Sequence, residues 1–192
     1  MSQFDVVAIG ASAGGLKALT TILSGLPGDL PVAILIVQHL DPRHKSLMAD
    51  ILQRNCKMPV KEAENGEQIK PGFVYIAPPN KHMLATNKRI VLTTTAFVHF
   101  SRPSIDLLFD SVAADYGDKT IGIVLTGTGV DGSIGIKAIK ERIGTTIAQD
   151  EGTSEHYGMP AAAIATGAVD FVLPIQDIAP AIIRLVTEQG ET

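Results

Sequence analysis

Two apolar runs near the N-terminus constrain the fold more than any other feature of the sequence. Residues 4–9 and 32–37 are continuous, rich in β-branched side chains, and lack the alternation of a strand with one wet face. Strands covered on both faces of a parallel sheet have this pattern. Residues 14–23 between them carry apolar side chains at helical spacing, and Gly25 and Pro27 end that helix. The sequence therefore opens with a predicted strand-helix-strand unit.

The same alternation returns in the second half of the chain. Strands are predicted over residues 120–125, 145–148 and 168–173, and helices over 45–55, 103–116, 132–142, 159–166 and 175–188. We therefore expect the α/β class, with a three-layer, doubly wound and mostly parallel sheet. Between residues 59 and 95 the runs are short and turn-rich, and 73–77 and 89–93 predict an antiparallel hairpin region at the sheet edge. These two patterns together predict a mixed sheet.

Length and composition exclude several classes of protein. At 192 residues and 45% hydrophobic, the chain suits one domain spanning 1–192 with a substantial core. The net charge of −4 and the absence of a long basic run argue against a nucleic-acid partner. The single cysteine, Cys56, forms no disulfide within the chain, and no apolar run is long enough to insert in a membrane. We expect a cytoplasmic protein.

The first predicted strand ends in a glycine-rich turn that contains a serine. Residues 10–14 fit the pattern G-x-S-x-G, in which small neighbours let a nucleophilic serine project above the sheet, here Ser12. The same kind of turn also binds nucleotide phosphates at a helix N-terminus, or it is merely a tight turn. Ser12 occupies the place of the second glycine of a dinucleotide fingerprint, which disfavours that alternative.

A histidine and an aspartate follow two other predicted strands. His39 ends the second strand, at the edge where α/β proteins bind their ligands. Asp131 lies in a second glycine-rich turn, residues 126–132, where it could simply cap the following helix. A hydroxyl, an imidazole and a carboxylate at three strand ends are the groups that nucleophilic acyl transfer needs. We therefore predict Ser12 as nucleophile, His39 as base and Asp131 as the residue that orients the base.

Several spaced motifs resemble, in the same order, those of the CheB catalytic domain. They are Ile9-Gly10-Ala11-Ser12-Ala13-Gly14-Gly15, Gln38-His39, Pro71-Gly72 with Tyr75-Ile76-Ala77-Pro78, Arg102-Pro103-Ser104 and Thr126-Gly127-Thr128-Gly129-Val130-Asp131-Gly132. The resemblance implies a protein-glutamate methylesterase that hydrolyses glutamate methyl esters on chemoreceptor helices, with glutamine deamidation in some members. It assigns the catalytic roles to the same Ser12, His39 and Asp131.

The remaining site predictions concern the oxyanion donors and the substrate-binding residues. The backbone N–H groups of Ala13 and of the turn at Thr128 are the expected oxyanion donors. Many members have threonine, methionine and asparagine where this chain has Ala13, Thr128 and Val130. Arg102 could bind acidic receptor segments and Met159 could line the cleft, although an unremarkable exposed arginine and a packing methionine are the alternatives.

No cofactor or metal is expected. His44, His82, His99 and His156 lack the spacing of a zinc site. Family members typically carry an N-terminal phosphorylatable receiver domain, whereas this chain starts just before its first predicted strand. We therefore expect no receiver in it, and regulation by a separate receiver or kinase unless the chain was excised from a longer protein. An inactive CheB-like interaction module and a nucleotide-binding domain remain as alternative functions.

Overall fold

The computed structural model describes residues 3–39, 47–98 and 101–187. Within them the strands are β1 (Val6–Ala11), β2 (Ala33–Gln38), β3 (Val60–Glu62), β4 (Val74–Ile76), β5 (His82–Thr86), β6 (Arg89–Thr93), β7 (Thr120–Val124), β8 (Thr145–Gln149) and β9 (Phe171–Leu173). The helices are α1 (Gly15–Gly25), α2 (Met48–Gln53), α3 (Ile105–Tyr116), α4 (Ser133–Glu141), α5 (Gly158–Ala165) and α6 (Ile175–Thr187), with a 3-10 turn at Gly117–Lys119.

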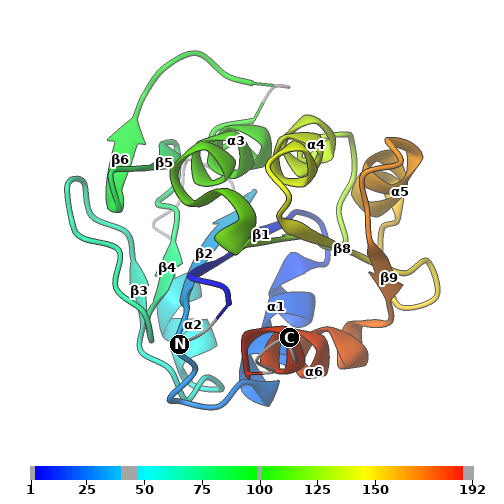
Figure 1. Ribbon diagram of the computed structural model, residues 1–192, viewed down its shortest axis with the longest axis horizontal. Helices are drawn as coiled ribbons and strands as arrows, with labels where there is room; N and C mark the ends of the chain where they lie inside the picture. The colour runs from blue at the N-terminus through cyan, green and yellow to red at the C-terminus, as the bar shows by residue number, and fades with distance from the viewer. Residues whose placement is uncertain (1–2, 40–46, 99–100, 188–192) are drawn as a thin grey trace.

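A seven-stranded parallel sheet forms the centre of the molecule (Figure 1). Its order is β3-β4-β2-β1-β7-β8-β9. In space, β1 therefore separates the strands of the first half of the chain, β2 to β4, from those of the second half, β7 to β9. The chain leaves β1 toward β2 through α1 on one face, and leaves β7 toward β8 through α4 on the other face. Ligand sites of open α/β sheets lie at the carboxyl ends of strands at such a switch point. The predicted fold class is confirmed.

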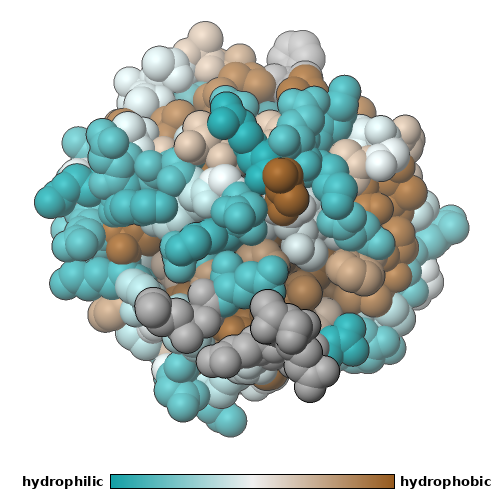
Figure 2. All heavy atoms as spheres, in the orientation of Figure 1, coloured by the Kyte–Doolittle hydropathy of each residue, from teal (hydrophilic) through white to brown (hydrophobic). Residues whose placement is uncertain are grey.

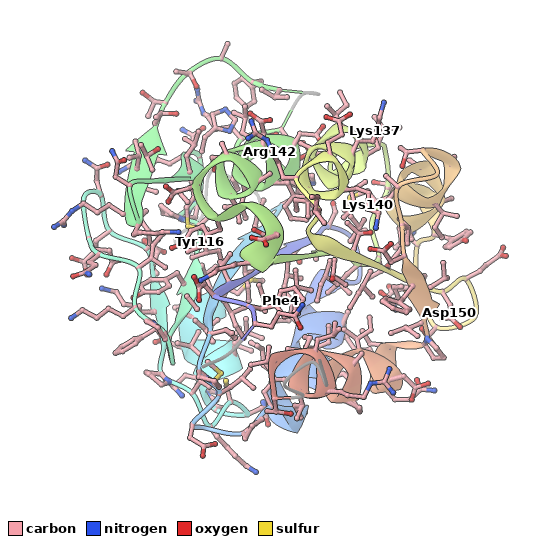
Figure 3. All side chains as sticks on the ribbon, viewed as in Figure 1. Phe4, Tyr116, Lys137, Lys140, Arg142 and Asp150 are labelled. Atoms are coloured by element: carbon pink, nitrogen blue, oxygen red, sulfur yellow. The ribbon has the colours of Figure 1, made fainter. Side chains whose placement is uncertain are left out.

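Alternate residues of the strands face two separate cores. One core packs sheet residues such as Val7 and Ile9 against α1, α2 and α6, and the other packs Val6 and Ala8 against α3, α4 and α5. Figure 1 shows these two groups of helices on opposite faces of the sheet. Phe4 belongs to the first core and Tyr116 to the second (Figure 3). Burial on both faces explains why the central strands are continuously apolar.

The hairpin region differs from its prediction in two details. Residues 74–76 form β4, which pairs in parallel with both β2 and β3, instead of an antiparallel strand. The hairpin is β5 with β6, a separate two-stranded sheet, so the main sheet is not mixed. The connection from β3 to β4 contains no helix, because residues 66–69 pair with β6 instead. A short, turn-rich connection is typical of antiparallel neighbours, so the prediction of an antiparallel strand at residues 73–77 was wrong.

Other elements begin and end close to the predicted residues, with one clear exception. The predicted strand 168–173 is shortened to β9, because the backbone before it bonds to a threonine side chain. Thr146 Oγ1 donates to the Ala168 carbonyl oxygen and accepts from the Asp170 N–H. Residues 45 and 46 of the predicted helix 45–55, and residue 188 of the helix 175–188, lie outside the described residues.

The surface is mainly polar on the face that Figure 2 presents. Apolar atoms gather toward one side of that view, over β9, where Phe171 and Val172 are 43% and 46% exposed. Among the helices of the described residues, none combines the length and the hydropathy needed to span a bilayer.

Candidate functional site

Hydrogen bonds beyond the strand ends bring the three predicted residues to one edge of the sheet. The His39 N–H donates to the Ala11 carbonyl oxygen at 3.1 Å, and the Ser12 N–H donates to the Thr126 carbonyl oxygen at 3.0 Å. These bonds continue the pairing of β1 with β2 and with β7. Ser12, His39 and the turn that carries Asp131 are therefore fixed side by side at the carboxyl edge.

The turn that carries Ser12 is tight at the two glycines that follow it. Gly14 has the left-handed φ of 79°, and the Gly15 N–H donates to the Ser12 carbonyl oxygen at 2.8 Å. A Cβ atom on Gly15 would lie 1.9 Å from Gln38 Oε1, so no larger residue fits there. Within the described part of the chain, neither the Ser12 hydroxyl nor the Ala13 N–H forms a hydrogen bond. Both groups remain available to a ligand.

Gln38 connects the turn that carries Ser12 to His39. Its buried side-chain Nε2 donates to the carbonyl oxygens of Ser12 at 2.8 Å and His39 at 3.0 Å. Its Oε1 is buried without a hydrogen bond in the described residues and lies against Gly15. The sequence motif contains Gln38, but the side chain had no predicted role.

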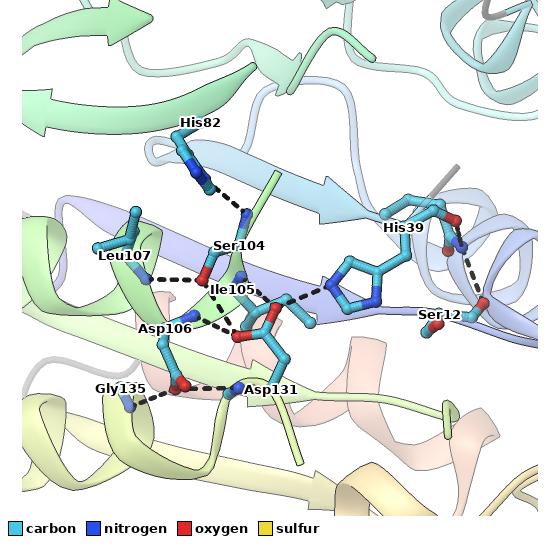
Figure 4. Close-up of polar contacts among 11 residues, drawn as sticks. Ser12, His39, His82, Ser104, Ile105, Asp106, Leu107, Asp131 and Gly135 are labelled. Atoms are coloured by element: carbon cyan, nitrogen blue, oxygen red, sulfur yellow. Dashed lines mark hydrogen bonds and ion pairs between the residues drawn. The ribbon is translucent and has the colours of Figure 1, made fainter. Parts of the chain in front are cut away.

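A hydrogen bond joins His39 to Asp131. His39 Nε2 lies 2.8 Å from Asp131 Oδ2, and the two side chains are 19% and 4% exposed. An ionised carboxylate only accepts hydrogen bonds, so Nε2 carries the proton and Nδ1 keeps its lone pair. In Figure 4 that second nitrogen lies on the side of the ring facing Ser12. The roles of the two nitrogens are reversed relative to the serine-protease template, where the carboxylate holds Nδ1.

The Asp131 carboxylate is buried and accepts several hydrogen bonds from the start of α3 (Figure 4). Oδ2 accepts from the Ile105 N–H at 2.8 Å, and Oδ1 accepts from the Asp106 N–H at 2.9 Å and from Ser104 Oγ at 3.2 Å. Burial raises the pKa of Asp131, but the hydrogen bonds from His39, Ile105 and Asp106 outweigh it and lower the pKa overall. The group is held as a carboxylate.

Asp131 does not cap its own helix, which was the alternative interpretation of its position. The N-cap of α4 is Gly132, which has no side chain of its own to cap the helix. Asp106 of α3 supplies that function, because its Oδ1 accepts from the Gly132 N–H at 3.0 Å and the Gly135 N–H at 2.7 Å. Asp131, which precedes α4, thus binds the N-terminus of α3, and Asp106 of α3 binds the N-terminus of α4.

The turn after β7 also packs closely behind Ser12. Thr126 Oγ1 donates to the Ala13 carbonyl oxygen at 2.9 Å and accepts from the His156 N–H at 2.8 Å. A Cβ atom on Gly127 would lie 2.5 Å from Met159 Sδ and 2.8 Å from the Ser12 Cβ. Met159 has no exposed surface, so it supports this turn and does not line the cleft.

Arg102 is occupied by the protein's own polar groups. Its Nε and Nη2 donate to Asn80 Oδ1 at 2.9 and 2.7 Å, and its Nη1 donates to the carbonyl oxygens of Thr94 and Thr95. Its guanidinium also lies 4.4 Å above the Phe97 ring. These contacts show that Arg102 holds the loop after β6, and its contact with acidic receptor segments stays a prediction.

A cleft of about 580 Å³ opens over Ser12 and His39. Leu16 and Met48 supply apolar surface, and Lys17 and Glu155 bring opposite charges to the lining. The exposed Thr128 is not among the lining residues, although its N–H has no protein acceptor within residues 3–39, 47–98 and 101–187. The same residues contain no cluster of three metal-ligating side chains, and His44 and His99 lie outside them.

Comparisons with known proteins show which family this chain resembles. Residues 7–182 match the family model described as CheB methylesterase. A protein from Moorella thermoacetica named protein-glutamate methylesterase/protein-glutamine glutaminase is 45% identical over 97% of this chain, which spans only 45% of that relative's length. A putative protein of the same name from Leptospira interrogans is 44% identical over 95% of both chains.

A solved structure is similar over almost its whole length. The CheB methylesterase catalytic domain of Thermotoga maritima has a TM-score of 0.92 and 40% sequence identity, over 95% of this chain and 99% of the other.

Some residues of the site escaped the sequence analysis. His82, Ser104 and Asp106 lie around Asp131, but they come from other segments of the chain. Ser104 was quoted only as part of a motif, and His82 only as an unpaired histidine. Ser104 is the N-cap of α3, and a serine near the start of a predicted helix was the one signal available in the sequence.

Proposed function

Because this chain belongs to the CheB methylesterase family, we propose that it hydrolyses glutamate methyl esters on the cytoplasmic helices of chemoreceptors. Ser12 is the nucleophile, His39 the general base and Asp131 the residue that orients the base. One observation carries the proposal: the carboxylate of Asp131 binds Nε2 of His39 and leaves Nδ1 on the side of Ser12. In such a triad the base needs its lone pair facing the nucleophile.

The reaction then proceeds in two transfers. Ser12 Oγ attacks the ester carbonyl while His39 Nδ1 takes its proton. The bond to the methoxy group breaks, methanol leaves with that proton, and a glutamyl ester of Ser12 remains. Water attacks this ester as Nδ1 takes one of its protons. That proton returns to Ser12 as the glutamic acid side chain leaves, and the acid then loses its own proton to solvent.

Negative charge on the attacked oxygen needs donors that are already in place. The Ala13 N–H lines the cleft next to Ser12 and has no hydrogen-bond acceptor among the described residues. The Thr128 N–H is the second proposed donor. Removing one such donor from an oxyanion hole costs about 3 kcal/mol of transition-state stabilisation.

The same acyl transfer can release ammonia from a glutamine side chain instead of methanol. Relatives of this chain are named for both activities. We propose glutamine deamidation as a second reaction of the same three residues. It differs only in the leaving group, which His39 protonates as it departs.

One feature of the turn argues against a nucleotide phosphate as the ligand. A Cβ atom on Gly14 would lie 3.0 Å from Glu155 Oε2, which puts a carboxylate against the N-terminus of α1. A second anion there would meet like-charge repulsion. A neutral ester meets none, which favours the esterase over the nucleotide-binding alternative.

Chemoreceptor helices as substrate place the reaction in the cytoplasm, where we expect this chain to act. We also propose that a separate receiver domain or kinase regulates it. Several longer relatives extend well beyond the matched region, since this chain spans 45% and 53% of two of them.

The decisive experiment measures methanol released from methyl-labelled chemoreceptor. The unsubstituted protein and Ser24→Ala, which changes an exposed serine at the far end of α1, should release methanol at equal rates. Ser12→Ala should release none above background. Equal release by Ser12→Ala would contradict the proposed nucleophile, and no release by the unsubstituted protein would contradict the proposed substrate.

A further inference from the structure

A buried histidine outside the three-residue site contacts it indirectly. His82 lies on β5, in the small antiparallel sheet, and its side chain has no exposed surface. Nδ1 accepts from the Ser104 N–H at 3.1 Å, and Nε2 lies 3.0 Å from the Ala96 carbonyl oxygen. An N–H only donates and a carbonyl only accepts, so the ring is the neutral tautomer with its proton on Nε2. Both nitrogens are therefore committed.

Ser104 connects this histidine to the carboxylate. It is fully buried, and its hydroxyl accepts from the Leu107 N–H at 3.3 Å while donating to Asp131 Oδ1 at 3.2 Å. Figure 4 shows the resulting series from His82 through Ser104 and Asp131 to His39. The hairpin is thus linked to the proposed base through Ser104, whose backbone N–H binds His82 and whose hydroxyl binds Asp131.

We propose that His82 is a positioning residue for the reaction, acting through Ser104 on Asp131. This inference rests on the function proposed above. Among the described residues, every donor to the Asp131 carboxylate other than His39 belongs to residues 104–106, at the start of α3. His82 Nδ1 is the acceptor that holds the first of these residues by its main chain. Its loss lets all three donors shift together, and with them Asp131 and His39.

The loop after β6 holds the His82 ring in position. Ala96, which accepts from Nε2, lies just beyond Thr94 and Thr95, whose carbonyl oxygens bind Arg102. Nε2 therefore binds a loop that Arg102 holds in place, while Nδ1 binds Ser104, the residue before α3. The two nitrogens have different roles, and only Nδ1 faces the site.

Two substitutions separate these roles. In His82→Asn the amide oxygen can occupy the place of Nδ1 and accept from Ser104, while the contact with Ala96 is lost. In His82→Gln the terminal amide nitrogen can occupy the place of Nε2 and donate to Ala96, while the acceptor for Ser104 is lost. Both variants remove one buried hydrogen bond, so we expect similar losses of stability. Urea unfolding midpoints check that the two variants are matched in this respect.

The methanol assay should distinguish the two variants. We expect kcat of His82→Gln to fall about tenfold further than kcat of His82→Asn, with similar KM, because a small displacement of a catalytic group lowers the rate steeply. Adding Ser104→Ala to His82→Gln should cause little further loss, because both substitutions interrupt one path. Equal losses in kcat for Asn and Gln, or fully additive losses in the double variant, would overturn the proposal.

A spectroscopic measurement tests the inference without any substrate. The proton between His39 Nε2 and Asp131 Oδ2 should give a downfield NMR signal that persists in His82→Asn and shifts or disappears in His82→Gln. An identical signal in both variants would count against the positioning role. If the unsubstituted protein releases no methanol, the proposed function fails, and this signal still decides the role of His82.

Discussion

The two glycine-rich turns, residues 10–15 after β1 and residues 126–132 after β7, look alike in sequence but differ in how they are held. In the first turn, the Ser12 hydroxyl and the Ala13 N–H have no partner within the described chain and face the cleft. In the second turn, Asp131 is buried and takes hydrogen bonds from the start of α3 as well as from His39. The first turn leaves the groups beside Ser12 free for a ligand, whereas the carboxylate of the second turn holds His39, the proposed base.

The largest effect should come from removing the charge of the second turn. Asp131→Asn is expected to lower kcat for methanol release by about 10⁴-fold, because an amide can hold the wrong tautomer of His39. Asp150→Asn, which changes an acid after the neighbouring strand β8, is the control and should retain activity. Near-normal turnover by Asp131→Asn would show that the second turn does not orient the base.

Crowding the second turn should disturb the first. The added methyl of Gly127→Ala meets Met159 and the Ser12 Cβ, so we expect kcat to fall about 100-fold through displacement of the nucleophile. Gly167→Ala, at a φ of 74° with no atom within 4 Å of the new methyl, should cost stability and leave kcat unchanged. If both variants lose activity in proportion to stability, the two turns are not coupled in this way.

Substituting Asp106, whose carboxylate binds the N-terminus of α4, should lower the free energy of unfolding more than it lowers kcat. Asp106→Asn removes the charge that accepts from the Gly132 and Gly135 N–H groups, and we expect the free energy of unfolding to fall by about 1–3 kcal/mol. Urea unfolding measures the change, with the exposed Asp110→Asn as a control on the same helix. An unchanged midpoint would mean that Asp106 contributes nothing net at this position.

The smallest effect should be the dependence of stability on pH. The pKa of Asp131 is lower in the folded state than in the unfolded chain. Its contribution is therefore complete above the unfolded value, about 3.9, and is lost as the pH falls toward the folded value. The difference in unfolding free energy between the parent and Asp131→Asn should shrink below about pH 4. A difference that stays constant from pH 7 to pH 3 would contradict the lowered pKa.

The parallel core and the position of the site could be predicted from the sequence. Continuous apolar strands that alternate with helices dictate a sheet buried on both faces. The carboxyl ends of such strands lie on one edge, which is why Ser12, His39 and Asp131 could be grouped from the sequence alone. The assignment of their catalytic roles stays a prediction until the variants are measured.

The partners of Asp131 could not be predicted in the same way. An aspartate before a helix indicates a cap on that helix, since a sequence window shows only near neighbours. Asp131 instead binds Ser104, Ile105 and Asp106, more than twenty residues away in the chain. The β3–β4 pairing has the same kind of cause, because a distant strand, β6, holds the connection that sequence analysis assigned to a turn.

The reciprocal contacts of Asp106 and Asp131 also have a consequence for local opening. Each helix relies on an acid supplied by the other, so neither N-terminus can separate without exposing unpaired N–H groups on both. Segments linked in this way open as one cooperative unit in hydrogen exchange. The amides of Asp106 and Gly135, which lie on different helices, should therefore exchange with deuterium at one common opening free energy.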